Sequence, residues 1–154
     1  MKKKVFLSVL AALLISVPVF AATQVETTIQ ATIGADLSIT TNIPGTKAID
    51  ITASSTTLGS VTISSNLTNW KIVIHSAKGG KMLRSGASDE YPYFLTFGST
   101  TGISLSSDYV IEKSAPQSAT TTNVAVTYTK ASDFSPALPA GTYEDTLTIS
   151  LVAL

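Results

Sequence analysis

The clearest pattern in the chain is a regular alternation of two kinds of residue near the N-terminus. From Val25 to Ile39 the odd positions carry aliphatic residues or Thr, while the even positions are mostly polar. Successive side chains of a β-strand point to opposite faces, so a period of two places the apolar residues of this segment on one face. The pattern predicts an extended segment with one face suited to burial.

Shorter alternations follow along the rest of the chain. They lie at 49–53, 61–63, 70–74, 91–97, 124–128 and 143–151. Turn-forming Gly and Pro residues separate them, and no long segment has the apolar period of a helix. About seven or eight short strands without helices predict an all-β fold, a single antiparallel β-sandwich of immunoglobulin-like type.

The first alternating run is too long for one strand of such a sandwich. At about 3.3 Å per residue, Val25 to Ile39 would extend over roughly 46 Å, whereas a typical strand measures about 17 to 20 Å. Gly34 is a natural breaking point, because glycine adopts backbone angles that are closed to other residues. Either the run bends near Gly34 and serves two sheets of its own domain, or its first half leaves the domain and pairs elsewhere.

In the second alternative, residues 22–34 act as a donor strand that leaves its own domain and pairs with a neighbouring subunit. An extended segment can complete the edge of another chain's sheet through backbone hydrogen bonds, while alternate side chains fill pockets. Burying the Ile and Val side chains of this arm contributes on the order of 5 to 8 kcal/mol before the cost of ordering it. The residues that would fill the pockets are Val25, Thr27, Ile29, Ala31 and Ile33.

The first residues have the form of a secretory signal peptide. Three lysines precede an apolar run at 5–20, which is followed by two alanines. The run is shorter than the roughly 20 residues that a membrane-spanning helix needs, and the short tri-lysine leader is typical of bacteria. We expect cleavage after Ala21 and no membrane span after cleavage. The chain then consists of a signal peptide (1–21), an N-terminal extension (22–34) and a β-sandwich domain (35–154).

The composition narrows the chemistry that the domain can support. Lys+Arg and Asp+Glu number 10 each, so the broad positive field of most nucleic-acid-binding proteins is missing. The chain has no Cys and one His, which excludes disulfides and thiolate metal sites and disfavours a histidine-based charge relay. We expect no enzyme activity, no cofactor, no metal site and no nucleic-acid partner.

One segment joins charged and aromatic residues beside a turn and is the candidate for ligand recognition. It consists of Asp89, Glu90, Tyr91 and Tyr93. The same residues also fit a solvated turn that leads into a core strand, because the two tyrosines continue the apolar positions of 91–97. The sequence leaves both interpretations open.

Three further residues have expected structural roles. Tyr143 follows Gly141-Thr142 just before the last alternation, which predicts a tyrosine corner whose hydroxyl bonds nearby backbone. Trp70 begins an apolar alternation and is expected in the core. His75 has the opposite parity in the same strand and is expected to be in solvent.

The alternation from Val25 to Ile39 and the closing segment from Pro139 to Leu151 together carry a family resemblance. The chain resembles subunits of the chaperone-usher pilins, within them the cysteine-free major subunits of alpha-type fimbriae, and it is similar to spore coat U domains. The resemblance implies an incomplete immunoglobulin-like sandwich, whose missing strand comes first from a periplasmic chaperone and then from the arm of the next subunit at an outer-membrane usher. It also implies that the last strand borders the groove, through Tyr143, Leu147, Ile149 and Leu151.

Two functions from different classes follow. The first is a structural subunit of a bacterial surface fibre, a fimbria or pilus, which is secreted through the periplasm, polymerises with copies of itself by donor-strand exchange and supports adhesion. The alternative is a self-contained secreted or surface β-sandwich that closes its own sheet with the N-terminal strand and binds a ligand such as a glycan. The length of the N-terminal run favours the fibre subunit.

Overall fold

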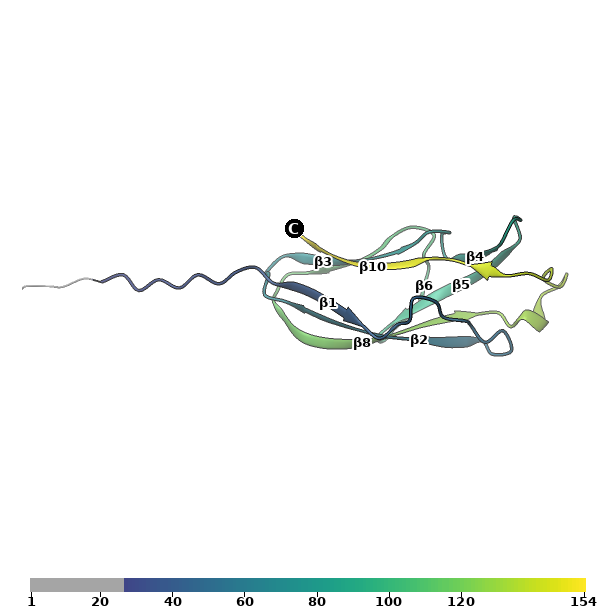
Figure 1. Cartoon of the computed structure of the whole chain (residues 1–154), viewed down its shortest axis with the longest axis horizontal. Helices are drawn as coiled ribbons and strands as arrows, with labels where there is room; N and C mark the ends of the chain where they lie inside the picture. Colours follow the sequence, from purple (N-terminus) through teal and green to yellow (C-terminus); the bar gives the residue numbers. More distant parts are fainter. Residues whose placement is uncertain (1–26) are drawn as a thin grey trace, which may run out of the picture. The chain divides into compact units, whose positions relative to one another are not determined.

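The computed structural model describes residues 27–154, so the expected signal peptide and Val25 lie outside the described residues. The chain divides into two units, residues 1–32 and residues 33–154. The second unit is built from antiparallel strands and one short 3-10 helix, η1 (Ala131–Asp133) (Figure 1). The strands are β1 (Leu37–Thr41), β2 (Ser55–Ser65), β3 (Trp70–Ser76), β4 (Lys81–Arg84), β5 (Glu90–Phe97), β6 (Thr100–Ile103), β7 (Tyr109–Lys113), β8 (Gln117–Tyr128), β9 (Tyr143–Glu144) and β10 (Leu147–Ala153).

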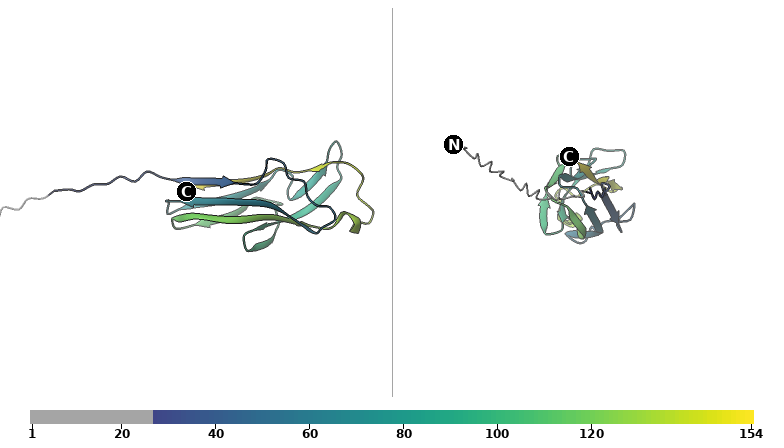
Figure 2. Two further views of the ribbon diagram at one scale, coloured as in Figure 1. Left: turned by 60° about the horizontal axis from the view of Figure 1, so that its bottom comes forward. Right: turned by 90° about the vertical axis from the view of Figure 1, so that its left-hand side faces the viewer.

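The strands form two sheets, and Figure 2 shows them as two layers of residues 33–154. The larger sheet has the order β1-β2-β8-β5-β4-β9, with β6 attached to β5, and the smaller has the order β10-β3-β7. Every strand pair is antiparallel. The all-β antiparallel fold expected from the alternations is therefore confirmed, and its curled, open sheets are consistent with an incomplete sandwich.

The core lies between the two sheets and takes its side chains from both. Its fully buried members come from the apolar alternations, as the period of two requires. They include Val61 and Ile63 of β2, Trp70 and Ile74 of β3, Leu95 of β5 and Val124 of β8. Trp70 is 0% exposed, which confirms its expected place, and its Nε1 donates to the Ala115 carbonyl at 3.0 Å.

The alternation at 49–53 does not form a strand, contrary to the sequence expectation. The Asp50 carboxylate accepts hydrogen bonds from the backbone N–H of Thr52 at 3.0 Å and from the Thr52 hydroxyl at 2.6 Å, and the Ala53 N–H bonds the Asp50 carbonyl at 3.0 Å. An Asp side chain that bonds its own downstream backbone favours a turn over a ladder. The bonds from Thr52 also lower the pKa of the Asp50 carboxyl.

The closing segment from Tyr143 to Leu151 is divided between the two sheets. Tyr143 and Glu144 form β9, which pairs with β4 in the larger sheet, whereas Leu147 to Ala153 form β10, which pairs with β3 in the smaller sheet. The expectation that Tyr143 belongs to the same last strand as Leu147 is therefore wrong. Asp145 and Thr146 carry the chain from one sheet to the other.

The long run from Val25 to Ile39 enters a sheet only at Leu37, where β1 begins. Residues 27–36 are exposed and belong to no strand. Among the described residues of the run, Ile29 is 93% exposed and Ile33 is 85% exposed, although both are large aliphatic side chains. Of the two alternatives open from the sequence, a second strand within the same domain is not formed in this structure.

Candidate functional site

Five strands of the domain pair with a single neighbour within residues 27–154, and two of these, β1 and β10, lie close to each other. β1 pairs with β2 alone, and β10 pairs with β3 alone, within residues 27–154. The two strands approach each other from different sheets, with Cα atoms within 8 Å but no backbone ladder between them. We call the region between them the β1–β10 opening, and Figure 2 shows the two strands close together.

The side chains at the opening are less buried than their partners in the adjoining strands. In β1, Ile39 is 38% exposed, whereas Ile63, directly opposite it in β2, is 1% exposed. In β10, the inward-facing residues Leu147, Ile149 and Leu151 pack against the core but are only half-buried. The core is thus incompletely covered along this side of the sandwich.

Charge is absent from both strands that border the opening. β1 has the sequence LSITT and β10 has the sequence LTISLVA, so neither contains an ionisable side chain. Residues 27–33 of the arm, TTIQATI, are equally uncharged. An uncharged strand can enter such a site without the large cost of burying an unpaired charge.

The spacing of β1 and β10 sets a condition on what can enter. Hydrogen-bonded strands lie about 4.7 to 4.9 Å apart, so a strand that pairs with both edges needs roughly 9.6 Å between them. Some Cα atoms of β1 and β10 lie within 8 Å of each other. Insertion of a strand therefore requires the two edges to separate further where they are closest.

The start of β10 is held by Asp145, a residue that the sequence did not single out for this role. Its Oδ2 accepts hydrogen bonds from the Ser76 hydroxyl at 2.6 Å and from the Tyr93 hydroxyl at 2.7 Å, and its Oδ1 accepts one from the Lys78 backbone N–H at 2.9 Å. The pKa of Tyr93 is raised, mainly because the phenol is buried and also because it donates a hydrogen bond to Asp145. The carboxylate thereby links β3, β5 and the segment that leads into β10.

Tyr143 forms the expected tyrosine corner, although in β9. Its hydroxyl donates to the Pro139 carbonyl at 2.9 Å, four residues upstream. Its ring lies edge-on to that of Tyr91, with the centroids 6.1 Å apart. Tyr143 therefore braces the loop before β9 and does not border the β1–β10 opening.

The candidate ligand segment consists of Asp89, just before β5, and the first residues of β5. Tyr91 is 2% exposed and Tyr93 is 7% exposed, so both rings lie in the core. Asp89 Oδ2 pairs with the Arg84 guanidinium, 2.6 Å from its Nη2, and Glu90 pairs with Lys81. This placement supports the interpretation of a turn leading into a core strand, because the aromatic rings face away from any ligand in solvent.

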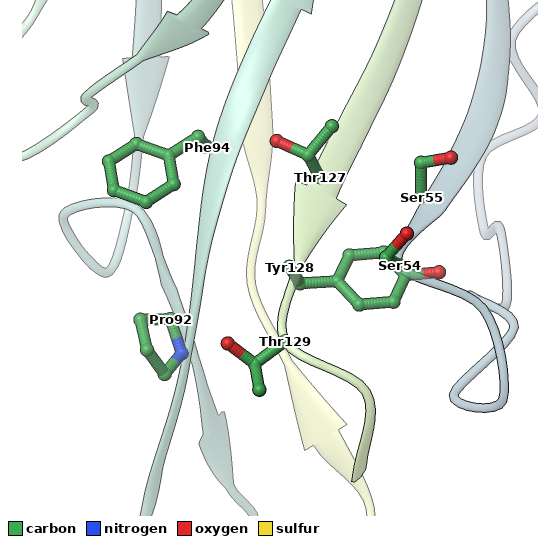
Figure 3. Close-up of a pocket in the computed structure, with 7 residues that line it drawn as sticks. All are labelled: Ser54, Ser55, Pro92, Phe94, Thr127, Tyr128 and Thr129. Atoms are coloured by element: carbon green, nitrogen blue, oxygen red, sulfur yellow. The ribbon is translucent and has the colours of Figure 1, made fainter. Parts of the chain in front are cut away.

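A hollow of about 480 Å³ lies instead on the outer face of the larger sheet (Figure 3). Phe94, 51% exposed, and Thr127 face each other across β5 and β8, and Ser55 of β2 pairs with Thr127 in turn. The sequence pattern did not predict this hollow, because its residues come from β2, β5, β8 and the segments next to them, which are far apart along the chain. Its lining residues are Ser54, Ser55, Pro92, Phe94, Thr127, Tyr128 and Thr129.

His75 is exposed, as expected, and its Nδ1 lies 2.7 Å from Asp108 Oδ1. Among residues 27–154, no group of three or more His, Cys, Asp or Glu side chains is placed to hold a metal ion. The described part of the chain contains no helix that is long and apolar enough to cross a membrane.

No protein-family model matches the sequence, and no curated protein matches it significantly.

Proposed function

We propose that this protein is a structural subunit of a bacterial surface fibre, in which the N-terminal arm of one copy completes the sandwich of the next. The observation that carries the proposal is the β1–β10 opening. The two strands that border it are uncharged, and the core beside it is only half-covered. The alternating N-terminal arm of the same chain is exposed. The arm and the opening have matching chemistry, since each offers backbone donors and acceptors together with aliphatic side chains.

The proposed contact would bury the aliphatic side chains of the arm and give β1 and β10 a further hydrogen-bonded neighbour. The arm's Thr27, Ile29, Ala31 and Ile33 would face the core beside Leu147, Ile149 and Leu151, while its backbone pairs with β1 and β10. Covering an edge also removes the hazard that unpaired strands present for non-specific association. The need to cover the free edges before assembly supports a periplasmic chaperone and an outer-membrane usher as assembly partners, as the family resemblance implies. The final location that follows is the cell surface.

The experiment that tests this function is electrophoresis of the assembled protein in detergent, with and without prior heating. Strand-exchanged subunits stay together until heat opens the sandwich, so a ladder of multiples in the unheated sample should collapse to one band after boiling. A monomer band in both samples would contradict the fibre function.

A second function is favoured by the hollow beside Phe94. Its lining contains no charged residue, and it combines an exposed aromatic ring with hydroxyls of Ser54, Ser55, Thr127 and Thr129 that make no side-chain hydrogen bond within residues 27–154 (Figure 3). An apolar platform with a few polar groups suits a neutral saccharide. Saccharide binding that is lost in Phe94→Ala but kept in Thr62→Ala would support this adhesive role.

A further inference from the structure

The end of the domain at which the arm leaves is held by one side chain, Asn66, in the turn between β2 and β3. Its Oδ1 accepts a hydrogen bond from the Asp36 N–H at 2.7 Å, and its Nδ2 donates to the Gly34 carbonyl at 2.7 Å. Its own backbone N–H donates to the Asp36 carbonyl at 3.1 Å. Asn66 therefore engages both ends of the tripeptide that precedes β1.

The strand directions show why this tripeptide matters. Leu37 pairs with Ser65 at the start of β1, and Ala153 pairs with Trp70 at the end of β10, on either side of the 66–69 turn. The Leu154 N–H also bonds the Asn69 carbonyl at 3.2 Å. The arm thus leaves at the same end at which β10 finishes, next to its own domain's opening.

The arm could close its own sandwich if the chain reversed between Gly34 and Asp36. Residues 27–33 are as many as the 7 residues of β10, so length does not prevent it. Gly34 has open space where a Cβ would be, and glycine accepts the backbone angles of a tight reversal. A reversed arm would run antiparallel to β1 and parallel to β10.

We propose that Asn66 is a positioning residue that opposes this self-closure and leaves the arm available to a second copy of the chain. A reversal at Gly34 must turn the Gly34 carbonyl and the Asp36 N–H away from their present directions, and both groups are bonded to Asn66. The inference rests on the proposed function, because it concerns which domain receives the arm.

The test compares Asn66→Ala with Asn42→Ala in the full-length exported protein. Asn42 is a matched control, because its Oδ1 accepts a hydrogen bond from the Ser60 N–H at 2.6 Å just beyond the other end of β1, away from the arm. Loss of the two side-chain bonds of Asn66 should raise the ratio of self-closed monomer to polymer about 5- to 30-fold. Asn42→Ala should leave that ratio unchanged.

The self-closed monomer is recognised by three readouts together. It runs as a monomer in the unheated gel, it unfolds at a higher urea concentration than a subunit with a free arm, and it does not bind a synthetic peptide of residues 23–35. Asn66→Asp keeps the acceptor for Asp36, but it replaces the donor for Gly34 with a carboxylate oxygen that faces the Gly34 carbonyl. It should therefore shift the ratio in the same direction, and it serves where Asn66→Ala does not fold.

The outcomes separate this inference from the proposed function. Wild-type polymer together with an unchanged ratio in both Asn66 variants would overturn the role of Asn66 and leave the fibre function standing. Wild-type protein that never polymerises would overturn the proposed function itself.

Discussion

Ile149 of β10 lies directly opposite Ile74 of β3, yet the two side chains have different surroundings. Ile74 is 0% exposed between two neighbouring strands, while Ile149 is only half-buried in β10, which pairs with β3 alone within the described part of the chain. The same contrast recurs across the larger sheet, between Ile63 and Ile39. The strand that we propose to enter the β1–β10 opening would account for both differences, and the following predictions depend on this proposal.

Replacing Ile29 by Asp should abolish assembly and leave the domain folded. The side chain is 93% exposed in the free subunit, so the fold loses no contact, but the donated strand would bring an unpaired carboxylate into the core of its neighbour. Unheated electrophoresis measures assembly, and a synthetic peptide of residues 23–35 should still bind the variant's own opening. Thr28→Asp, with the opposite parity, is the control and should assemble; polymers of Ile29→Asp would show that the arm is not the donor.

Ile149→Ala should weaken the fibre more than the free subunit. Truncating a fully buried Ile costs about 2 to 5 kcal/mol, and Ile149 reaches full burial only when a strand covers it. Urea unfolding of the free subunit should show a loss at or below the lower end of that range, and dissociation of polymers by denaturant should show a loss nearer the upper end. Thr148→Ala, on the exposed face of the same strand, should change neither value appreciably. Equal losses for Ile149→Ala in both assays would mean that no strand is inserted.

Tyr93→Phe should destabilise the domain by about 1.5 to 3 kcal/mol, the range for a hydrogen bond to a charged group. The variant removes the hydroxyl that donates to Asp145 at 2.7 Å and leaves the ring in the core. Urea unfolding measures the change, with Tyr143→Phe as the control, since its exposed bond to a backbone carbonyl should contribute less. A loss no larger than that of the control would contradict the linking role of Asp145.

The stabilisation by Tyr93 should also depend on pH in a defined direction. Its pKa is raised in the folded domain, so the folded state holds the phenol proton more tightly than the unfolded chain does. The contribution is complete below the ordinary value near 10, and it falls as the pH rises above that value because the unfolded chain ionises first. The difference in unfolding free energy between wild type and Tyr93→Phe should therefore be constant at neutral pH and decrease above pH 10. A difference that grows with pH would contradict this sign.

The fold class and most of the core were predictable because burial follows the period of two. Trp70, Ile72 and Ile74 alternate in the sequence and are buried together in β3. The strand expected at 49–53 failed because Asp50 folds the backbone into a turn through its side chain, an interaction that an apolar pattern does not record. The division of the closing segment between β9 and β10 also escaped prediction, since it depends on which sheet each half reaches.

The opening itself was predictable only in outline. The alternation of Leu147, Ile149 and Leu151 indicates that one face of this segment packs on the core. It does not indicate that these side chains are only half-buried, because that depends on which strands lie beside β10. The roles of Asn66 and Asp145 could not be predicted from the sequence for a related reason. Each acts on residues 30 or more positions away, through bonds such as those to Asp36 and Tyr93, and no local period signals them.

The most direct test of donation uses the absence of native Cys, because any disulfide must then come from introduced residues. Single-cysteine proteins Ile29→Cys or Ala31→Cys are mixed with Ile149→Cys or Leu151→Cys, allowed to assemble and oxidised, with Val110→Cys on β7 as the control partner. Neighbouring strands bring Cα atoms to the roughly 4.4 to 6.8 Å that a disulfide requires. Donation predicts a disulfide-linked dimer in at least one arm and β10 mixture and none with Val110→Cys. No dimer in any mixture, together with an intramolecular disulfide when both cysteines are placed in one chain, would show that the arm closes its own sandwich.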